Sequence, residues 1–157
     1  MKSARLSEDG VYRFRLSRRW SPERCVLWVM LNPSTADADN DDPTIRRCIG
    51  FAKDWGYGAI NVGNLYALRA TDPAELAKHH DPYGVGNCLH LREMAKESAL
   101  IVAAWGAHKF VRPLHAMTVL ASLRDCAPIK CLGKTKSGAP RHPLYVARDA
   151  ALVDYLI

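Results

Sequence analysis

Three short, mainly apolar runs constrain the fold of this chain more than any other feature. Residues 25–31 read C-V-L-W-V-M-L, and residues 59–65 and 100–105 form two further runs of the length of a strand. Strands that are apolar on both faces lie in the middle of a sheet that is covered on both sides, and such sheets are mostly parallel. The runs therefore predict a covered, mostly parallel central sheet.

The segments between these runs have the features of helices. Asp42-Pro43 offers an N-cap followed by proline at the first helical position, and Ile45, Ile49 and Ala52 then recur at helical spacing. Strands that alternate with helices indicate an α/β fold with parallel crossover connections. Further helices are expected to open at residues 71–73 and to span residues 85–98, 110–123 and 149–156.

The N-terminal region predicts one more strand. Tyr12, Phe14 and Leu16 alternate with polar and basic residues such as Arg13, which is the pattern of a half-buried strand with a basic outer face. No repeat, low-complexity tract or linker divides the sequence, so residues 1–157 are expected to form a single domain. The predicted architecture is a three-layer α/β/α sandwich with a short, mostly parallel central sheet and an N-terminal strand or hairpin.

Charge and cysteine usage narrow the class of protein. The chain has 22 Lys and Arg against 16 Asp and Glu, a formal net charge of +6, which favours a polyanionic partner. No apolar run approaches the roughly 18 residues of a membrane span, and residues 1–7 lead into no apolar block like that of a secretory signal. The five cysteines are scattered without a C-x-x-C pair, unlike a disulfide framework or a zinc site. We therefore expect a monomeric, cytoplasmic protein that uses neither metal nor cofactor.

Polar residues follow each apolar run where a strand is expected to end. Asn32 follows the first run, Asn64 lies at the end of the second, and Trp105 closes the third. A short apolar element near residues 129–132 leads into a basic loop that contains His142. Open parallel sheets bind ligands at the carboxyl ends of their strands, so we expect these side chains to converge on one rim.

The side chains at this rim suit chemistry on a nucleobase. An amide presents a donor and an acceptor together, so Asn64 can read the Watson–Crick edge of an extruded base. Asn32 can orient a water or a substrate carbonyl, and the imidazole N–H of His142 can stabilise an oxyanion on a departing group. Each residue also has a structural alternative: a turn former at Asn32, a core amide bonded to backbone at Asn64, and a loop or structural histidine at His142.

Two charged segments lie near these residues. The basic segment suits contacts to phosphates, although a solvated loop is the alternative, and Leu144 and Tyr145 within it can wedge between bases or stack on them. The acidic run over residues 37–42 departs from a calcium loop at its sixth and twelfth positions, so helix capping is the preferred account, with Asp37 kept as a candidate water-activating base. The positive charges of the basic segment are Lys130, Lys134, Lys136, Arg141 and Arg148.

Several motifs resemble, in order, those of a bacterial family known mainly as a domain of unknown function. They are M-L-N-P-S-T-A-D at residues 30–37, D-P-T-I-R-R-C at residues 42–48, W-G at residues 105–106 and H-P-L-Y at residues 142–145. Their order is also similar, more distantly, to that of the uracil-DNA glycosylase superfamily. This second resemblance implies a uracil-DNA glycosylase-like α/β/α fold around a short parallel sheet.

The superfamily resemblance also implies roles for individual residues. Asn32 would position the attacking water, with Asp37 as a further catalytic candidate, and His142 would act as the electrophile. The cysteines do not reproduce the four-ligand pattern of the iron–sulfur branches, so no cluster is expected. The implied base-binding residues are Asn64, Pro33, Ser34 and Tyr66. The implied backbone or wedge residues are Lys134, Lys136, Arg141, Leu144 and Tyr145.

Together these features suggest a monofunctional N-glycosylase. It would hydrolyse the glycosidic bond of a damaged or modified base, in DNA rather than RNA, after extruding the nucleotide. Two alternatives stay open: a non-catalytic module that binds nucleic acid, and a hydrolase that acts on free nucleosides or nucleotides.

Overall fold

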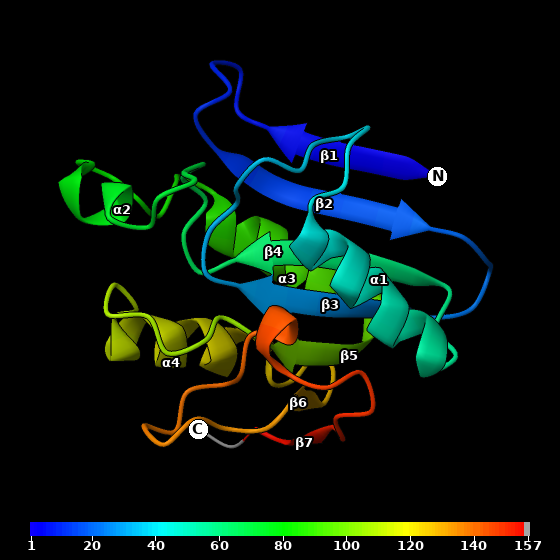
Figure 1. Cartoon of the computed structure of the whole chain (residues 1–157). Coiled ribbons are helices and arrows are strands. Elements are labelled where there is room, and N and C mark those ends of the chain that lie inside the picture. The colour runs from blue at the N-terminus through cyan, green and yellow to red at the C-terminus, as the bar shows by residue number, and fades with distance from the viewer. Residues whose placement is uncertain (156–157) are drawn as a thin grey trace.

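The computed structural model describes residues 1–155, which form a mixed α/β fold on a seven-stranded sheet (Figure 1). In their order across the sheet, the strands are β1 (Lys2–Leu6), β2 (Arg13–Arg19), β4 (Ala59–Asn64), β3 (Cys25–Met30), β5 (Ser98–Ala103), β6 (Ile129–Cys131) and β7 (Val153–Asp154). The helices are α1 (Pro43–Asp54), α2 (Glu75–Lys78), α3 (Asn87–Lys96) and α4 (Pro113–Leu123), with a short 3-10 helix, η1 (Pro143–Tyr145).

The centre and the edges of the sheet differ in strand direction. β3 pairs in parallel with β4 and β5, and β5 pairs in parallel with β6. The β1–β2, β2–β4 and β6–β7 pairs are antiparallel. The expected short, mostly parallel sheet is therefore not confirmed, because the N-terminal hairpin extends one edge of the sheet and β7 extends the other. The predicted hairpin itself is present as β1 and β2.

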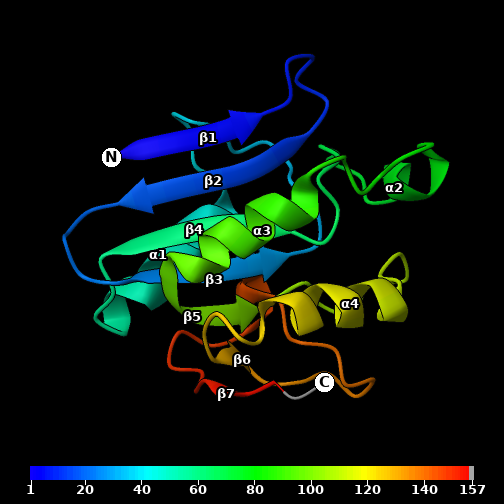
Figure 2. The same ribbon diagram turned by 180° about the vertical axis from the view of Figure 1, so that it is seen from behind.

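Helices cover both faces of the sheet. α1 lies on one face (Figure 1), where the ring of Trp28 on β3 packs 6.1 Å from that of Phe51 and 5.8 Å from that of Trp55. α3 and α4 lie on the opposite face (Figure 2), over a core that includes Leu27 and Ile101. β3 and β4 are consequently buried at every position, which explains their apolar composition.

The helix starts follow local sequence signals, but the predicted C-terminal helix is wrong. α1 begins after Asp42, whose Oδ1 accepts the amide hydrogen of Ile45 at 2.8 Å. α4 begins at Pro113, so this proline opens the helix and does not kink it. Within residues 149–155 there is no helix, because the backbone there pairs with the free edge of β6 as β7. Residue 156 of that prediction lies outside the described residues.

Arg13 of β2 does not lie on the exposed basic face that its alternation predicts, and Arg18 is buried as well. Arg13 and Arg18 are only 3% and 2% exposed. The loop after β3 lies against both side chains, since Arg13 Nη1 donates to the Ala36 carbonyl at 2.6 Å and Arg18 Nε donates to Asp41 Oδ1 at 2.7 Å. Tertiary contacts therefore bury both cations, although local periodicity assigns Arg13 to solvent.

The five cysteines differ in how far they are buried. Cys25, Cys48 and Cys131 are buried free thiols, whereas Cys88 is exposed and Cys126 is half-buried. Burial raises the pKa of each of the three buried thiols, which favours the protonated form. Among residues 1–155, no helix is both long enough and apolar enough to cross a membrane.

Candidate functional site

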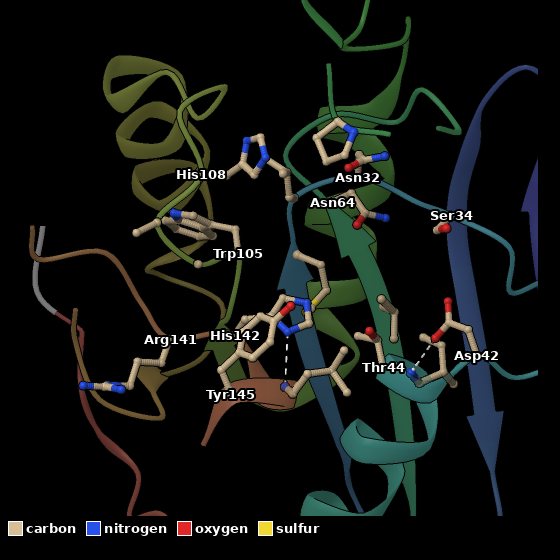
Figure 3. Close-up of a pocket in the computed structure, with 18 of the residues that line it drawn as sticks. Asn32, Ser34, Asp42, Thr44, Asn64, Trp105, His108, Arg141, His142 and Tyr145 are labelled. Atoms are coloured by element: carbon tan, nitrogen blue, oxygen red, sulfur yellow. Dashed lines mark hydrogen bonds between the residues drawn. The ribbon is translucent and has the colours of Figure 1, made fainter. Parts of the chain in front are cut away.

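A cavity of about 610 Å³ opens at the carboxyl ends of β3, β4 and β5 (Figure 3). Its size falls within the range of about 300–1,000 Å³ that is usual for ligand pockets. Asn32, Asn64, Trp105 and His142 all line it, although they come from four separate segments of the chain. The predicted convergence of these side chains on one rim is confirmed.

Asn64 presents a buried, unpartnered amide to this cavity. It is the last residue of β4 and is 2% exposed, and its Nδ2 has no hydrogen-bond partner among the described residues. Its backbone carbonyl, by contrast, accepts a hydrogen bond from Asn87 Nδ2 at 2.9 Å. Buried polar groups are nearly always paired, so an unpaired amide at a cavity wall is a group available to a ligand. The backbone-bonded core amide is not what the structure shows.

Asn32 combines a structural role with a free acceptor. Its Nδ2 donates to the carbonyl of Pro33 at 3.0 Å and to that of Ala70 at 2.8 Å, which fixes the turn after β3. These bonds use both amide hydrogens and leave Oδ1 as the only acceptor that the side chain can offer. Asn32 is therefore a turn former whose oxygen can also hold a water.

His142 is held in one orientation and in one tautomer. Its Nδ1 accepts the amide hydrogen of Leu144 at 3.2 Å at the start of η1, so the proton of the neutral ring lies on Nε2. Burial lowers the pKa of His142, and the carboxylate of Asp42 opposes that shift. Arg47 of α1 fixes the segment that carries His142, because its guanidinium donates to the carbonyls of Pro143, at 3.0 Å, and Val146.

Asp42, not Asp37, is the carboxylate at the cavity. Asp42 lines the cavity, and its Oδ1 caps α1. Asp37 is not among the lining residues; its Oδ1 accepts the amide hydrogens of Asp39 and Asn40 at 2.9 and 2.8 Å, which lowers its pKa. Sequence reasoning missed Asp42 because helix capping fully explains an Asp before Pro43. The signal available was its position, since the helix after β3 begins near the carboxyl edge of the sheet.

Two of the expected base-binding residues lie elsewhere. Tyr66 is 2% exposed and does not line the cavity; its hydroxyl donates to the Phe110 carbonyl and accepts the Arg112 amide hydrogen, each at 3.1 Å. Pro33 is buried outside the lining, whereas Ser34 borders the cavity. Tyr66 packs into the core beneath α3 and α4, whereas the aromatic residues Trp105 and Tyr145 line the cavity itself.

The basic loop contributes only part of its length to the cavity. Arg141, Leu144 and Tyr145 line it, and Leu144 and Tyr145 are 41% and 79% exposed. Lys134 and Lys136 are exposed but do not border it. The cavity therefore has an amide-rich floor and an exposed apolar and cationic margin (Figure 3).

Arg13 is a buried cation in the wall of the cavity that sequence reasoning placed on an outer face. It donates to the Ala36 carbonyl through Nη1, but its Nε has no partner among the described residues. Burial lowers the pKa of Arg13 to about 10, so the side chain stays charged at neutral pH. The burial of Arg13 results from its contact with the loop after β3, and local sequence carries no signal of that contact.

Comparison with known proteins identifies the family and nothing more specific. No curated protein and no solved structure matches the chain. A family model described as "Protein of unknown function (DUF1643)" matches residues 13–144, a span that begins at β2, ends within η1 and contains every lining residue named above except Tyr145. The chain therefore belongs to the DUF1643 family.

Proposed function

We propose that this protein is an N-glycosylase that hydrolyses the bond between a nucleobase and its sugar in DNA. The observation that carries the proposal is the pairing, in one cavity, of an unpartnered Asn64 amide with a His142 ring that offers Nε2–H. The first group suits recognition of a base edge, and the second suits stabilisation of a base as it departs. A uracil-DNA glycosylase-like architecture is part of the same proposal, and the helices on both faces of the parallel strands support it.

Base recognition falls to Asn64. An extruded base offers adjacent donors and acceptors on its Watson–Crick edge, and a primary amide complements such a pair. Because Asn64 is buried and its Nδ2 is unpaired, a base that reaches it satisfies a polar group that is otherwise left without a partner. Trp105 at the cavity wall offers an apolar surface against which the base can pack.

His142 stabilises the departing base. As the glycosidic C1′–N bond breaks, its electron pair moves onto the base and generates negative charge there. The neutral imidazole donates a hydrogen bond from Nε2 to this charge, a form of stabilisation that grows as the transition state is approached. Burial favours that neutral form by lowering the pKa of His142.

Attack by water completes the reaction. We assign Asp42 as the base that accepts the proton of the water, while Asn32 Oδ1 orients the same molecule. The water oxygen bonds to C1′, and the free base and an abasic sugar are the products. Asp42 replaces Asp37 in this role because only Asp42 borders the cavity.

A polymeric substrate is supported by the margin of the cavity. Leu144 and Tyr145 expose apolar surface beside Arg141, as a wedge and its phosphate contact would require. Lys134 and Lys136 lie further out on the same loop, where phosphate contacts position a duplex without reading its sequence.

The proposal is tested by release of free bases. Single-stranded and duplex DNA carrying a panel of damaged and modified bases is incubated with the protein, and mass spectrometry detects the bases released. We expect release of at least one base with creation of alkali-labile sites, loss of release in His142→Ala, and full activity in His80→Ala, which alters an exposed histidine that does not line the cavity.

Two outcomes contradict the proposal. Salt-dependent DNA binding without release of any base indicates a non-catalytic binding module. Release from mononucleotides but from no polymer indicates a hydrolase of free nucleotides that uses the same groups.

A further inference from the structure

We propose that the cavity contains a phosphate subsite formed by Arg13 together with the hydroxyls of Ser34 and Thr44. The phosphate is that of the nucleotide whose base reaches Asn64, so the inference rests on the proposed function for the identity of the ligand. Binding of an anion at Arg13 stands independently of any base release.

The first support is the state of the Arg13 side chain. It is 3% exposed, and no carboxylate of the described residues lies within ion-pair distance of it. Its Nε is buried without a hydrogen-bond partner. Buried charges are normally paired, so a buried guanidinium that borders a cavity and lacks both an ion pair and one hydrogen bond is a site for an anion.

The second support is that neither nearby carboxylate forms an ion pair with Arg13. Asp42 and Asp37 both act on Arg13 through space, but neither contacts it. Asp42 Oδ1 accepts from Ile45, and Asp37 Oδ1 accepts from the backbone of its own loop. Arg69 and Arg18 add positive potential around Arg13 and favour an anion there.

The third support is the supply of uncharged donors. Ser34 and Thr44 line the cavity, and neither hydroxyl makes a hydrogen bond within the described residues. Figure 3 shows Ser34 and Thr44 on the side of the cavity away from Trp105 and Arg141. Hydroxyl and guanidinium donors from separate segments suit a tetrahedral oxyanion, and they place it apart from the exposed cations of the basic loop.

The fourth support is the position of Arg13 relative to Asn64. The Arg13 amide donates to the Ala67 carbonyl at 3.0 Å, three positions beyond Asn64, and β2 pairs with β4. A base at Asn64 and a phosphate at Arg13 therefore occupy neighbouring parts of one cavity, as the two ends of one nucleotide do.

The direct test observes Arg13 in the unaltered protein. Nε–Hε signals of arginine are followed by ¹⁵N NMR while inorganic phosphate is added at constant ionic strength. We expect the Arg13 signal to shift with a saturable dependence on phosphate. A signal that stays in place while phosphate is raised overturns the proposal, whatever the variants do.

Two probes that carry no base distinguish the source of the phosphate. One is tetrahydrofuran 5′-phosphate, a free monoester, and the other is a trinucleotide with a central tetrahydrofuran residue, which offers diesters. Shift of the Arg13 signal by the trinucleotide assigns the subsite to a polymer, and shift by the monoester alone assigns it to a free nucleotide. Shift by neither sugar phosphate overturns the proposal.

Variants then measure the contribution of charge. Arg13→Gln is expected to weaken phosphate binding by about tenfold or more, since a charged hydrogen bond is lost. Arg24→Gln is the matched control, because it removes the same charge from an exposed residue outside the cavity. Equal loss in both variants overturns the proposal.

The direction in which Asp42→Asn changes phosphate affinity gives a second criterion. Asp42 lies on the same side of the cavity as Ser34 and Thr44 (Figure 3), so Asp42→Asn removes a repulsion and is expected to tighten phosphate binding. Weaker phosphate binding in this variant contradicts the proposed location. Phosphate binding at Arg13 without base release refutes only the proposed glycosylase activity. Base release by a protein whose Arg13 NMR signal does not respond to phosphate refutes only the phosphate subsite.

Discussion

The paired strands β2 and β4 bury an arginine and an asparagine toward each end, and the two ends differ in whether these side chains have partners. At the end distant from the cavity, Arg18 pairs with Asp41 at 2.7 Å. Asn61 there accepts from the Ser17 hydroxyl at 2.6 Å and donates to Glu97 at 3.4 Å. Every one of these polar groups has a partner within the protein, so this end has a structural role.

At the cavity end, Arg13 and Asn64 each retain a buried nitrogen without a partner. Asp42 follows Asp41 directly in sequence, yet it faces the cavity and not an arginine. The same residue types thus stabilise the fold at one end and stay available for a ligand at the other. Local satisfaction of hydrogen bonds, not residue type, separates a structural group from a functional one.

The adjacent aspartates give the largest expected difference. Asp42→Asn should lower kcat for base release by about 10²- to 10⁴-fold, because it removes the proton acceptor. It should change stability by less than about 0.5 kcal/mol, because asparagine caps a helix as well as aspartate does. Asp41→Asn should instead reduce the free energy of unfolding and leave kcat near that of the unaltered protein. Single-turnover kinetics measures the rate of base release, and urea unfolding measures stability. A loss of activity in Asp41→Asn and a loss of stability in Asp42→Asn would contradict the comparison.

The two arginines come next. Arg18→Met leaves Asp41 and several carbonyls unpaired, so we expect a loss of about 3–5 kcal/mol in the free energy of unfolding. Arg13→Met removes a cation that has no ion pair but leaves the Ala36 carbonyl without its donor, so it should cost about 1–3 kcal/mol. Equilibrium unfolding in urea measures both changes in the free energy of unfolding. Equal losses in the two variants would show that Arg13 is as structural as Arg18.

The two asparagines should differ by a smaller amount. Asn61→Leu strands the Ser17 hydroxyl and should cost about 1–3 kcal/mol. Asn64→Leu replaces an unpaired buried amide by an apolar side chain, so its free energy of unfolding should stay the same or rise. Its kcat/KM for base release should fall by about tenfold to a hundredfold. Destabilisation of Asn64→Leu as large as that of Asn61→Leu would reveal a structural role for Asn64.

The smallest expected effect is a dependence on pH at the cavity end. Burial lowers the pKa of His142 in the folded protein below that of the unfolded chain, so the unfolded chain binds more protons between the two values. Stability should therefore decline as the pH falls through about 6.5 and level off below the folded-state pKa. Base release should decline with protonation of His142 in the folded protein, because a proton on Nδ1 abolishes the hydrogen bond from the Leu144 amide that orients the ring.

Matched variants isolate the contribution of His142. Burial also lowers the pKa of His90, which lies outside the cavity, so both histidines contribute to the loss of stability in acid. His142→Gln and His90→Gln should each reduce the loss of stability in acid. Only His142→Gln should change the acid limb of the activity profile. An activity profile that moves with His90 would contradict the assignment.

Local patterns in the sequence predict the centre of the fold and the location of the site. The apolar runs correspond to β3, β4 and β5, and Asp42-Pro43 marks the start of α1. The convergence of Asn32, Asn64 and His142 follows from the rule that parallel strands end at one edge. Helix capping and the apolar composition of central strands act over short distances along the chain, so they leave clear sequence signals.

Other features depended on contacts between distant segments. The segment that forms β7 is paired only because β6 has a free edge, and Tyr66, in the segment after β4, packs into the core beneath α3 and α4. Asp37 and Asp42 look alike in sequence, but the loop turns one carboxylate onto its own backbone and the other toward the cavity. Periodicity carries no information about such partners.

The amino-acid sequence by itself determined the three central strands, the start of α1 and the rim that they share, since apolar runs and helix caps are local causes. Only the tertiary structure decided which buried nitrogens remain without a partner: one of Arg13 and none of Arg18, and one of Asn64 and none of Asn61. The physical reason is that a buried hydrogen-bonding group is satisfied or left open by atoms that lie far away in sequence, and folding alone brings those atoms close.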